Sequence, residues 1–586
     1  MHFTTAGPGH VVGNGNGCVR SARVLFSWVL SSGLVPALLL AMSNGALAQA
    51  LPDAGALQPQ IERQKPRLTP APAPLQSLPE PLAASADLKV TVKQFRFAGN
   101  TVLREEQLSA VVAGFLNRPL DFNGLQEAVA AVAAAYRASD RLVRVYLPRQ
   151  DVTDGTVTLQ IVESVFGKVR VEGLSSRLRP NDTSAYVTAA QPIGTLVDTA
   201  ALDRALLLLD ELPGVGVSGR LAPGEGQGQT DLVLNVADQP LFSGSLGFDN
   251  NGSLSTGPSR YLANGYINSP TGRGDLMEVN LLHSDGSDYG RLRYSLPVGH
   301  QGLRLGGNIS RFDYRLVSGG FKALDAKGGS GGWGLDARYP LLRSRARNLF
   351  AAVSYSDSVF TNKANGAVVT QYGVKTWDFN LLGDFYDTFH GGGANVLGLT
   401  LTAGDLNLGR SPNQAQDAAT VRTAGSFVKL RYFLSRQQAI TPDLALYISW
   451  SGQRAERNLD SSQKFYLGGA DGVRAYPFLE GGGAEGDLIN IELRKRLMEN
   501  VTVAGFYDRG WVRHNVDNNF SGAPLLNSYS LNGVGAFVSW SGPGNINVKA
   551  TYAHRLGRNP NPTAFGADQD GSLTTDRIWV SAILPL

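Results

Sequence analysis

Residues 489–495 read INIELRK, and this alternation of apolar and polar residues decides the fold class. The apolar set is Ile489, Ile491 and Leu493, and the polar set is Asn490, Glu492 and Arg494. A period of two residues is typical of a β-strand, because successive side chains point to opposite faces. Three more runs share the pattern: residues 275–283 (DLMEVNLLH), 291–297 (RLRYSLP) and 546–552 (INVKATY). Strands with one apolar and one charged face predict a transmembrane β-barrel with its charges inward, since a soluble sandwich would bury its apolar face.

Runs of this kind continue through residues 239–586. They start near residues 241, 258, 274, 288, 302, 331, 347, 372, 394, 420, 441, 487, 501, 530, 545 and 574. This makes 16 antiparallel strands, and an even number is the rule for bacterial single-chain barrels. The lumen of such a barrel is wide enough for water or a chain segment. A secreted all-β domain is the alternative interpretation.

Composition excludes several function classes. The chain has 586 residues, of which 69 are glycine and 17% are charged. Its net charge of +4 at pH 7 argues against nucleic-acid binding, because phosphate contacts require a concentrated basic surface. The single cysteine, Cys18, lies in a segment that we expect to be removed. The mature chain therefore has no disulfide, thiolate nucleophile or cysteine-ligated metal.

The first 48 residues have the order of features of a secretory signal peptide. Arg20 and Arg23 precede an apolar run over residues 24–41, and the small residues 46–48 (ALA) follow. An N-terminal anchor helix is the alternative. Residues 49–87 hold a short polar stretch with helical potential and then a linker rich in proline and alanine. Such a linker is expected to be a semi-extended tether.

Residues 88–163 and 164–238 predict two small α+β domains with one layout. In each, a strand is followed by a helical region and then by two strands joined by a turn. The turn is Asp154-Gly155 in the first domain, a standard hairpin signal, and is glycine-rich in the second. Two successive units with the same order of elements form an internal repeat. Exposed strand edges on such domains are docking sites for an extended chain.

One segment of the barrel region is a long loop. Residues 451–486 separate two strand runs, and residues 464–487 read KFYLGGADGVRAYPFLEGGGAEGD. Structureless loops of this length are usually functional. The segment resembles the inward-folded loop of TpsB-type two-partner secretion transporters, which are the haemolysin secretion/activation proteins (ShlB/FhaC/HecB) of the POTRA-bearing barrel superfamily. The matching residues are Gly468, Gly469, Val473, Arg474 and Tyr476, with Ala475 at the usual glycine of Val-Arg-Gly-Tyr.

A second family motif, Phe-x-Asp-x-Gly, lies on the strand just after this loop as Phe506, Asp508 and Gly510. The resemblance implies that Arg474 pairs with Asp508 and pins the loop tip inside the barrel. An arginine in a narrow lumen needs a carboxylate, which its planar guanidinium can bind through two hydrogen bonds. Glycines allow the loop backbone to approach the wall.

The resemblance covers nearly the whole mature chain. The stretch that is similar to the family's N-terminal plug helix comprises Gln60, Ile61, Glu62 and Arg63. The repeated units resemble the family's two POTRA domains. The chain departs from the family in two places. Residues 139–141 read SDR where Arg-Gly-Tyr is common, and Leu586 ends the chain where an aromatic residue is common.

Catalytic signatures are missing from the sequence. None of the seven histidines forms an i, i+4 metal pair, and no HExxH motif, GxSxG nucleophile elbow or P-loop occurs. We therefore expect no enzymatic activity, no cofactor and no metal. An Asp/His or Ser/His site that forms only in three dimensions is the alternative. The glycine clusters are interpreted as surface turns.

The resemblance implies an outer-membrane translocator of a Gram-negative bacterium, with its POTRA domains in the periplasm. The implied partner is one large secreted protein, of haemolysin or adhesin type, with an N-terminal secretion domain. A monomer surrounded by outer-membrane lipid is expected, inserted by the barrel-assembly machinery. The alternatives are an outer-membrane assembly factor of the same superfamily and a gated porin. Two domains before the barrel, the N-terminal helix and the linker favour the translocator.

Overall fold

The structure is a computed structural model that describes residues 52–62, 89–173, 175–409 and 411–586. The predicted signal peptide, Arg63 and the proline-rich linker lie outside the described residues. All described residues belong to one compact unit, residues 49–586. Among them, no helix has the length and apolar character needed to cross a membrane.

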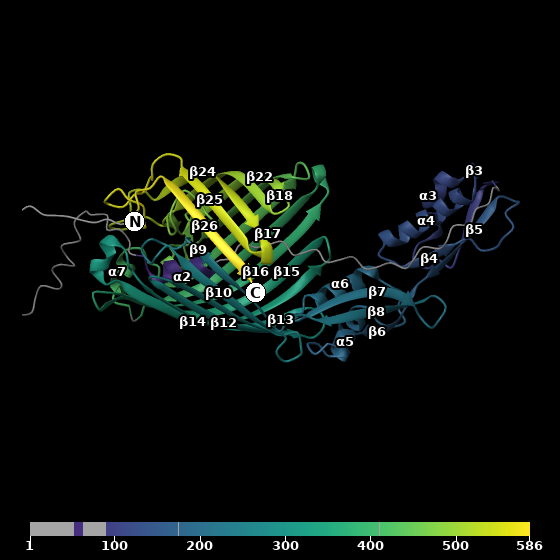
Figure 1. Cartoon of the computed structure of the whole chain (residues 1–586), viewed down its shortest axis with the longest axis horizontal. Coiled ribbons are helices and arrows are strands. Elements are labelled where there is room, and N and C mark those ends of the chain that lie inside the picture. Colours follow the sequence, from purple (N-terminus) through teal and green to yellow (C-terminus); the bar gives the residue numbers. More distant parts are fainter. Residues whose placement is uncertain (1–51, 63–88, 174, 410) are drawn as a thin grey trace, which may run out of the picture. The chain divides into compact units, whose positions relative to one another are not determined.

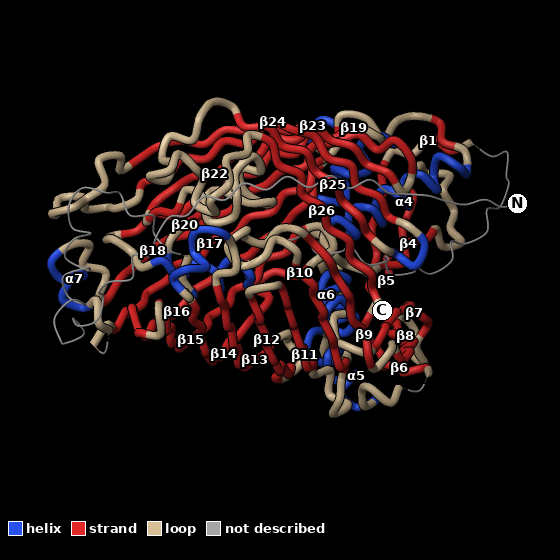
Figure 2. The backbone as a smooth tube through the Cα atoms, turned by 60° about the vertical axis from the view of Figure 1, so that its left-hand side comes forward, coloured by secondary structure: helices blue, strands red, loops and turns tan. Residues whose placement is uncertain are grey.

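Sixteen antiparallel strands close into one barrel (Figures 1 and 2). In chain order they are β9 (Phe242–Asp249), β10 (Arg260–Asn268), β11 (Leu276–Ser284), β12 (Ser287–Val298), β13 (Leu303–Arg315), β14 (Lys327–Arg343), β15 (Arg347–Ala364), β16 (Ala367–Asp387), β17 (Gly393–Asn407), β18 (Gly425–Ala439), β19 (Leu444–Ala455), β22 (Glu485–Met498), β23 (Val501–Arg513), β24 (Ser528–Ser541), β25 (Asn547–Arg555) and β26 (Asp576–Pro585). Each strand pairs with the next barrel strand, and β26 closes on β9. The predicted 16-stranded barrel is confirmed, and each strand begins within a few residues of its predicted start.

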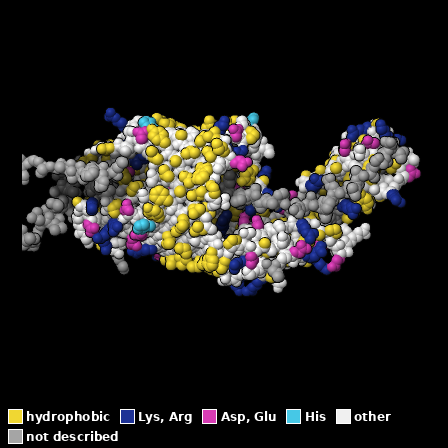
Figure 3. Space-filling view, viewed as in Figure 1, with side chains coloured by type: hydrophobic (Ala, Val, Ile, Leu, Met, Phe, Trp, Pro, Cys, Tyr) yellow, Lys and Arg dark blue, Asp and Glu magenta, His cyan; other side chains and the backbone are white. Residues whose placement is uncertain are grey.

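The two faces of the barrel wall differ as the alternation predicts. Outward side chains such as Ile309 and Leu335 are exposed, and on the face shown in Figure 3 the hydrophobic side chains form a band around the barrel. On the inner face, Arg293 lies between Glu278 and Asp336, with nitrogen–oxygen distances of 3.1 and 2.9 Å. Exposed apolar side chains outside and ion pairs inside are the arrangement that a lipid environment requires.

The loops at the two ends of the barrel differ in length. The end at which β9 begins has short turns, such as residues 299–302 and 499–500. The opposite end has long loops, including residues 408–424, which contain helix α7 (Gln414–Ala419), and residues 556–575. In bacterial barrels the short turns face the periplasm and the long loops face the outside. The first end is therefore the periplasmic end.

The two small domains share one topology. The first contains β2 (Gln94–Ala98), α3 (Glu105–Val112), α4 (Phe122–Ala138), β4 (Val143–Tyr146) and β5 (Thr156–Glu163), with the short pair β1 (Val90–Thr91) and β3 (Pro119–Leu120). The second contains β6 (Val165–Glu172), α5 (Pro180–Ala190), α6 (Thr199–Asp210), β7 (Val215–Pro223) and β8 (Gln229–Asp238). In both sheets the first strand runs parallel to the last, which also pairs with the middle strand.

Each small domain has one helix more than the sequence pattern indicated. Helix α3 is only eight residues long and buries two apolar side chains, Leu108 and Val112. Helix α5 buries only Thr183, Tyr186 and Val187. Two or three buried positions give too weak a period to be recognised, whereas α4 and α6 each present a continuous buried face.

A short helix, α2 (Ala54–Glu62), lies inside the barrel and is the purple segment in Figure 1. Asp53 caps its first turn, accepting a hydrogen bond of 2.8 Å from the backbone amide of Ala56. The predicted plug residues Gln60, Ile61 and Glu62 belong to this helix. The fourth predicted residue, Arg63, lies outside the described residues.

Candidate functional site

The loop between β19 and β22 folds into the barrel. Strand β19 extends to Ala455 and β22 begins at Glu485, so the loop spans residues 456–484, which is shorter than the predicted 451–486. Its two arms are joined by β20 (Phe465–Tyr466) and β21 (Gly482–Gly483). This two-residue ladder makes the loop a hairpin, and its tip at residues 468–477 is closed by a hydrogen bond from the Gly469 amide to the Tyr476 carbonyl.

Three glycines allow the tip to turn. Gly469 has φ +105°, a conformation that residues with a side chain rarely adopt. A Cβ at Gly468 would overlap the carbonyl oxygen of Pro477, and one at Gly472 would overlap that of Leu467. Gly468 and Gly469 were predicted from the motif. Gly472 was not, although it lies directly before Val473.

Arg474 and Asp508 form a buried pair with two parallel hydrogen bonds. Arg474 Nε donates to Asp508 Oδ2 at 2.8 Å, and Nη2 donates to Oδ1 at 2.6 Å. The backbone amide of Arg474 donates to the same Asp508 Oδ2 at 3.0 Å. The two residues expose 3% and 0% of their surfaces. Asp508 therefore fixes both the side chain and the backbone of Arg474.

A second carboxylate, Glu492 of β22, completes the charge balance around Arg474. Arg474 Nη1 donates to Glu492 Oε1 at 2.8 Å, and Arg494 Nε donates to Glu492 Oε2 at 2.7 Å. Asn490 Nδ2 donates to Asp508 Oδ1 at 2.7 Å and to the Gly472 carbonyl at 3.1 Å. Two carboxylates thus face two guanidinium groups. The sequence placed Glu492 on an inward face but gave no sign of this role.

Aromatic side chains enclose the pair. The guanidinium of Arg474 lies 3.4 Å from the ring centre of Phe506, and Trp579 of β26 donates its indole N–H to the Arg474 carbonyl at 2.7 Å. Tyr476 is 1% exposed, and the Arg555 guanidinium lies 4.2 Å from its ring centre. Cation–π contacts of this kind strengthen when water is excluded.

Glycines of the barrel wall leave the space in which the loop packs. A Cβ at Gly510 would lie 2.7 Å from Leu467 Cδ2 and 3.1 Å from Val473 Cγ2. A Cβ at Gly533 would lie 2.7 Å from the Cβ of Ala475. The methyl group of Ala475, at the family's usual glycine, is accommodated because Gly533 of β24 has no side chain.

The outer end of the loop is held by Glu480. Its carboxylate accepts hydrogen bonds from Asn559 Nδ2 at 3.0 Å and from the Gln569 amide at 2.8 Å, both in the loop that joins β25 to β26. The carboxyl group is fully buried, and burial raises its pKa to about 7. The partners lie 79 and 89 residues away in sequence, so no local pattern could have indicated them.

The lumen helix contacts both the wall and the loop. The Ala54 amide donates to Asn362 Oδ1 at 2.9 Å, Tyr289 donates to Glu62 at 2.9 Å, and Ser330 donates to Gln58. Ser461 of the loop donates to the Asp53 carboxylate at 2.9 Å. Burial, and then the charge of Asp460, raises the pKa of Asp53 to about 6.

Comparisons with known proteins agree with this architecture. The family model "Haemolysin secretion/activation protein ShlB/FhaC/HecB" matches residues 228–533, and the ShlB-type POTRA domain model matches residues 90–164. The chain is 26% identical over 546 residues to the heme/hemopexin transporter protein HuxB of Haemophilus influenzae, covering 88% of this chain and 94% of that protein. It is 22% identical over 447 residues to the outer membrane transporter CdiB of Dickeya dadantii, covering 74% and 78%. The solved structure of CdiB from Escherichia coli has a TM-score of 0.65 at 19% identity and covers 88% of this chain and 94% of that one.

Proposed function

The chain belongs to the haemolysin secretion/activation protein family, and from this premise we propose that it exports one large protein across the outer membrane by two-partner secretion. The observation that carries the proposal is the pairing of Arg474 with Asp508 and Glu492 inside a closed 16-stranded barrel. A passive porin has no need of a loop fixed across its own lumen. Nor does it need two recognition domains before its barrel.

The small domains provide the surfaces for capture of the partner. Strand β4 is an edge strand of the first sheet, and β6 and β7 are the edge strands of the second. Edge strands present unpaired backbone groups to an extended segment. We assign the N-terminal secretion domain of the exported protein to these edges, since it reaches the periplasm unfolded.

The barrel then opens by release of helix α2. Among its side chains, only Ala54, Ala56 and Leu57 are buried apolar groups, and they pack in one cluster with apolar wall residues. Its other contacts with the wall are hydrogen bonds that water can replace. The net value of such a hydrogen bond is about 0.5–1.5 kcal/mol. Release of the helix is therefore a low-cost step, and folding of the partner outside the cell provides the direction of transport.

The protein acts as a monomer with no catalytic site and no cofactor. A closed barrel leaves no unpaired strand edge in the membrane. Each chain has its own lumen, helix and loop, so one copy is sufficient for transport. The barrel-assembly machinery is required only for insertion of the chain.

A secretion assay tests the proposal. A large exported protein with an N-terminal secretion domain, taken as the candidate partner, is expressed with the intact chain, without it, and with Arg474→Ala, and is quantified in the medium. We expect export only with the intact chain and a loss of more than about tenfold with Arg474→Ala, because the buried Asp508 loses its cationic partner and Glu492 keeps only Arg494. Arg457→Ala is the matched control, since Arg457 is a partly exposed arginine of the same loop whose guanidinium donates to the Ser426 and Arg422 carbonyls.

The same assay separates the alternatives. If the partner stays in the periplasm while other barrels fail to insert on depletion of the chain, the protein is an assembly factor. If neither process changes, a gated pore remains. Immunoblots of the variant in the outer membrane exclude loss of the barrel itself.

A further inference from the structure

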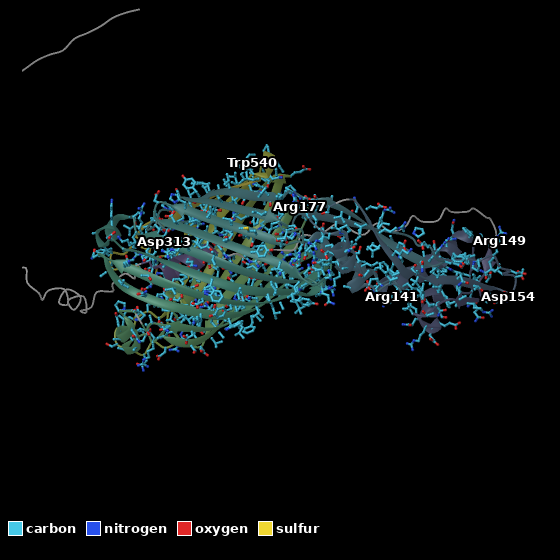
Figure 4. All side chains as sticks on the ribbon, turned by 90° about the horizontal axis from the view of Figure 1, so that it is seen from below. Arg141, Arg149, Asp154, Arg177, Asp313 and Trp540 are labelled. Atoms are coloured by element: carbon cyan, nitrogen blue, oxygen red, sulfur yellow. The ribbon has the colours of Figure 1, made fainter. Side chains whose placement is uncertain are left out.

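A groove of about 680 Å³ lies at the extracellular end of β11 to β15. The residues that line it include His283, Asp288, Arg311, Asp313, Lys327 and Lys363. The side chains of Arg311 and Asp313 are 69% and 51% exposed, and Figure 4 labels Asp313 on the barrel wall. The volume is in the range of small-ligand sites, roughly 300–1,000 Å³. The proposed transport function uses none of these residues.

The register of the strands places the groove on the outer face. Ile309 lies opposite Trp333, and both side chains are exposed to lipid. Two residues further along each strand, Arg311 lies opposite Gly331, and a further two residues along, Asp313 lies opposite Gly329. Residues two apart share one face of a strand. The groove therefore begins directly above the apolar band, at the level of the outer headgroups.

Glycines of β14 form the floor of the groove. A Cβ at Gly331 would lie 3.9 Å from Arg311 Nη1, and one at Gly329 would lie 2.6 Å from Asp313 Oδ1. The Arg311 guanidinium is held by Asp313 through two hydrogen bonds, Nε to Oδ2 at 2.8 Å and Nη2 to Oδ1 at 2.5 Å. The ion pair therefore lies over glycines, so that no side chain of β14 displaces it. The two hydrogen bonds keep the guanidinium in a fixed orientation at the surface.

Three cations lie side by side at the upper edge of the groove. Arg315 is opposite Lys327 in the register of β13 and β14, and Lys327 is opposite Lys363 in that of β14 and β15. Like charges directly opposite each other destabilise a sheet. Asp325 offsets part of this repulsion, 2.8 Å from Lys327 Nζ, and Arg315 donates from Nε and Nη2 to the carbonyl of Asp285, a further residue of the groove, at 3.2 and 3.0 Å. A row of three cations is most readily explained by an anion that bridges them.

We propose that this groove binds the phosphorylated headgroup of a glycolipid of the outer leaflet. The cation row formed by Arg315, Lys327 and Lys363 contacts the phosphate, Arg311 and the His283–Asp288 pair contact the sugar, and the acyl chains lie along Ile309 and Trp333. Basic side chains near a membrane surface contribute about 1 kcal/mol each to binding of anionic lipid. The site anchors one wall of the barrel to its lipid and is independent of the exported protein.

The test measures glycolipid retained by the full chain. The protein is extracted from outer membranes in mild detergent, and bound phosphorylated glycolipid is quantified by native mass spectrometry. The variant Arg315→Gln/Lys327→Gln/Lys363→Gln is expected to retain at most about one tenth of the glycolipid that the wild type retains, because each charge contributes to binding. The matched control is Arg347→Gln/Lys495→Gln/Arg496→Gln, which removes three exposed cations at the periplasmic end and is expected to retain the wild-type amount.

A second variant covers the case in which the first one fails to fold. Gly331→Leu adds a side chain to the floor of the groove without removing a charge, and its Cβ would meet no atom closer than Arg311 Nη1, at 3.9 Å. We expect it to reduce retained glycolipid as well. Wild-type retention in both variants would overturn the proposal, and so would equal loss in the periplasmic control. Re-addition of dephosphorylated glycolipid, or of phosphatidylglycerol, is expected to restore no binding, and equal binding of either would also overturn it.

Discussion

Helix α2 and the inward loop both occupy the lumen, but they are held there by different interactions. The helix is held by the packing of three small or medium apolar side chains and by hydrogen bonds, among them those from the Ala54 amide to Asn362 and from Tyr289 to Glu62. The loop is held by Arg474, whose guanidinium is buried between Asp508 and Glu492. Water can replace the first kind of contact at little cost. It cannot replace the second kind without leaving buried charges unpaired.

This difference assigns the two segments different roles. A segment that must leave during transport should have contacts of low net energy, and α2 has them. A segment that must stay should have partners that are costly to separate, and the loop has them at its tip through Arg474 and at its outer end through Glu480. We therefore expect the helix to move and the loop to remain as part of the wall.

The largest expected effect comes from Asp508→Ala. Arg474 then keeps only Glu492 in a buried site, and the free energy of unfolding should fall by about 3–5 kcal/mol, as for other broken buried ion pairs. Thermal unfolding of the purified barrel, followed by its heat-modifiable migration, measures the change. Asp443→Ala removes an exposed carboxylate at a periplasmic turn and should leave the midpoint unchanged. An unchanged midpoint for Asp508→Ala would show that the pair contributes nothing.

The next effect is expected for Gly472→Ala. Its methyl group would overlap the Leu467 carbonyl, so the tip must shift away from Asp508. We expect the loop to become sensitive to protease in intact outer-membrane vesicles. The control is Gly505→Ala, a glycine of β23 with open space around its Cβ position, which should remain resistant. Equal resistance of both variants would contradict the role assigned to Gly472.

A smaller effect on stability, but a clear one on conductance, is expected for Gln58→Ala/Glu62→Ala. The variant removes hydrogen bonds from Ser330 and Tyr289 to the helix, each worth about 0.5–1.5 kcal/mol. The lumen should open more often in planar bilayers while the unfolding midpoint stays near that of the wild type. A midpoint as low as that of Asp508→Ala would remove the distinction between the helix and the loop.

The smallest effect is a pH dependence at the outer end of the loop. Burial raises the pKa of Glu480 to about 7 from 4.5, so the folded loop binds the proton more tightly than the unfolded chain does. The stabilisation of the folded loop by this proton is fully present below pH 4.5 and is lost as pH rises through about 7. The equilibrium constant for local opening of the loop changes by at most about tenfold per pH unit. Hydrogen exchange of residues 556–575 should therefore be faster at pH 8 than at pH 6. Glu480→Gln should remove this difference beyond the intrinsic exchange rate.

The barrel could be predicted because its signal is local. Each barrel strand carries its own two-residue period, as residues 489–495 illustrate, and the loop motif lies within a few residues of Arg474. Glu492 could not be recognised as a partner, because every inward position of a barrel strand can be charged. The contacts of Glu480 with residues 559 and 569 depend on where two loops meet in space. Helices α3 and α5 bury too few apolar residues to show a helical period.

Two engineered disulfides test most directly whether the helix moves and the loop stays. The sequence has no cysteine after Cys18, so introduced pairs are unambiguous, and the periplasm is oxidising. Gly55→Cys/Ser461→Cys ties the helix to the loop, since a Cβ at Gly55 would lie 2.7 Å from Ser461 Oγ. The same Cβ would overlap the Tyr372 hydroxyl, so this variant also carries Tyr372→Phe. Val473→Cys/Gly510→Cys ties the loop to the wall, where a Cβ at Gly510 would lie 3.1 Å from Val473 Cγ2. This variant also carries Leu467→Ala, because the same Cβ would lie 2.7 and 3.0 Å from the two Cδ atoms of Leu467.

Secretion of the partner is then measured with and without reductant. The account predicts that the helix tether stops secretion until reductant is added, whereas the loop tether leaves secretion at the level of the reduced protein. Block of secretion by the loop tether, together with normal secretion through the tethered helix, would contradict it.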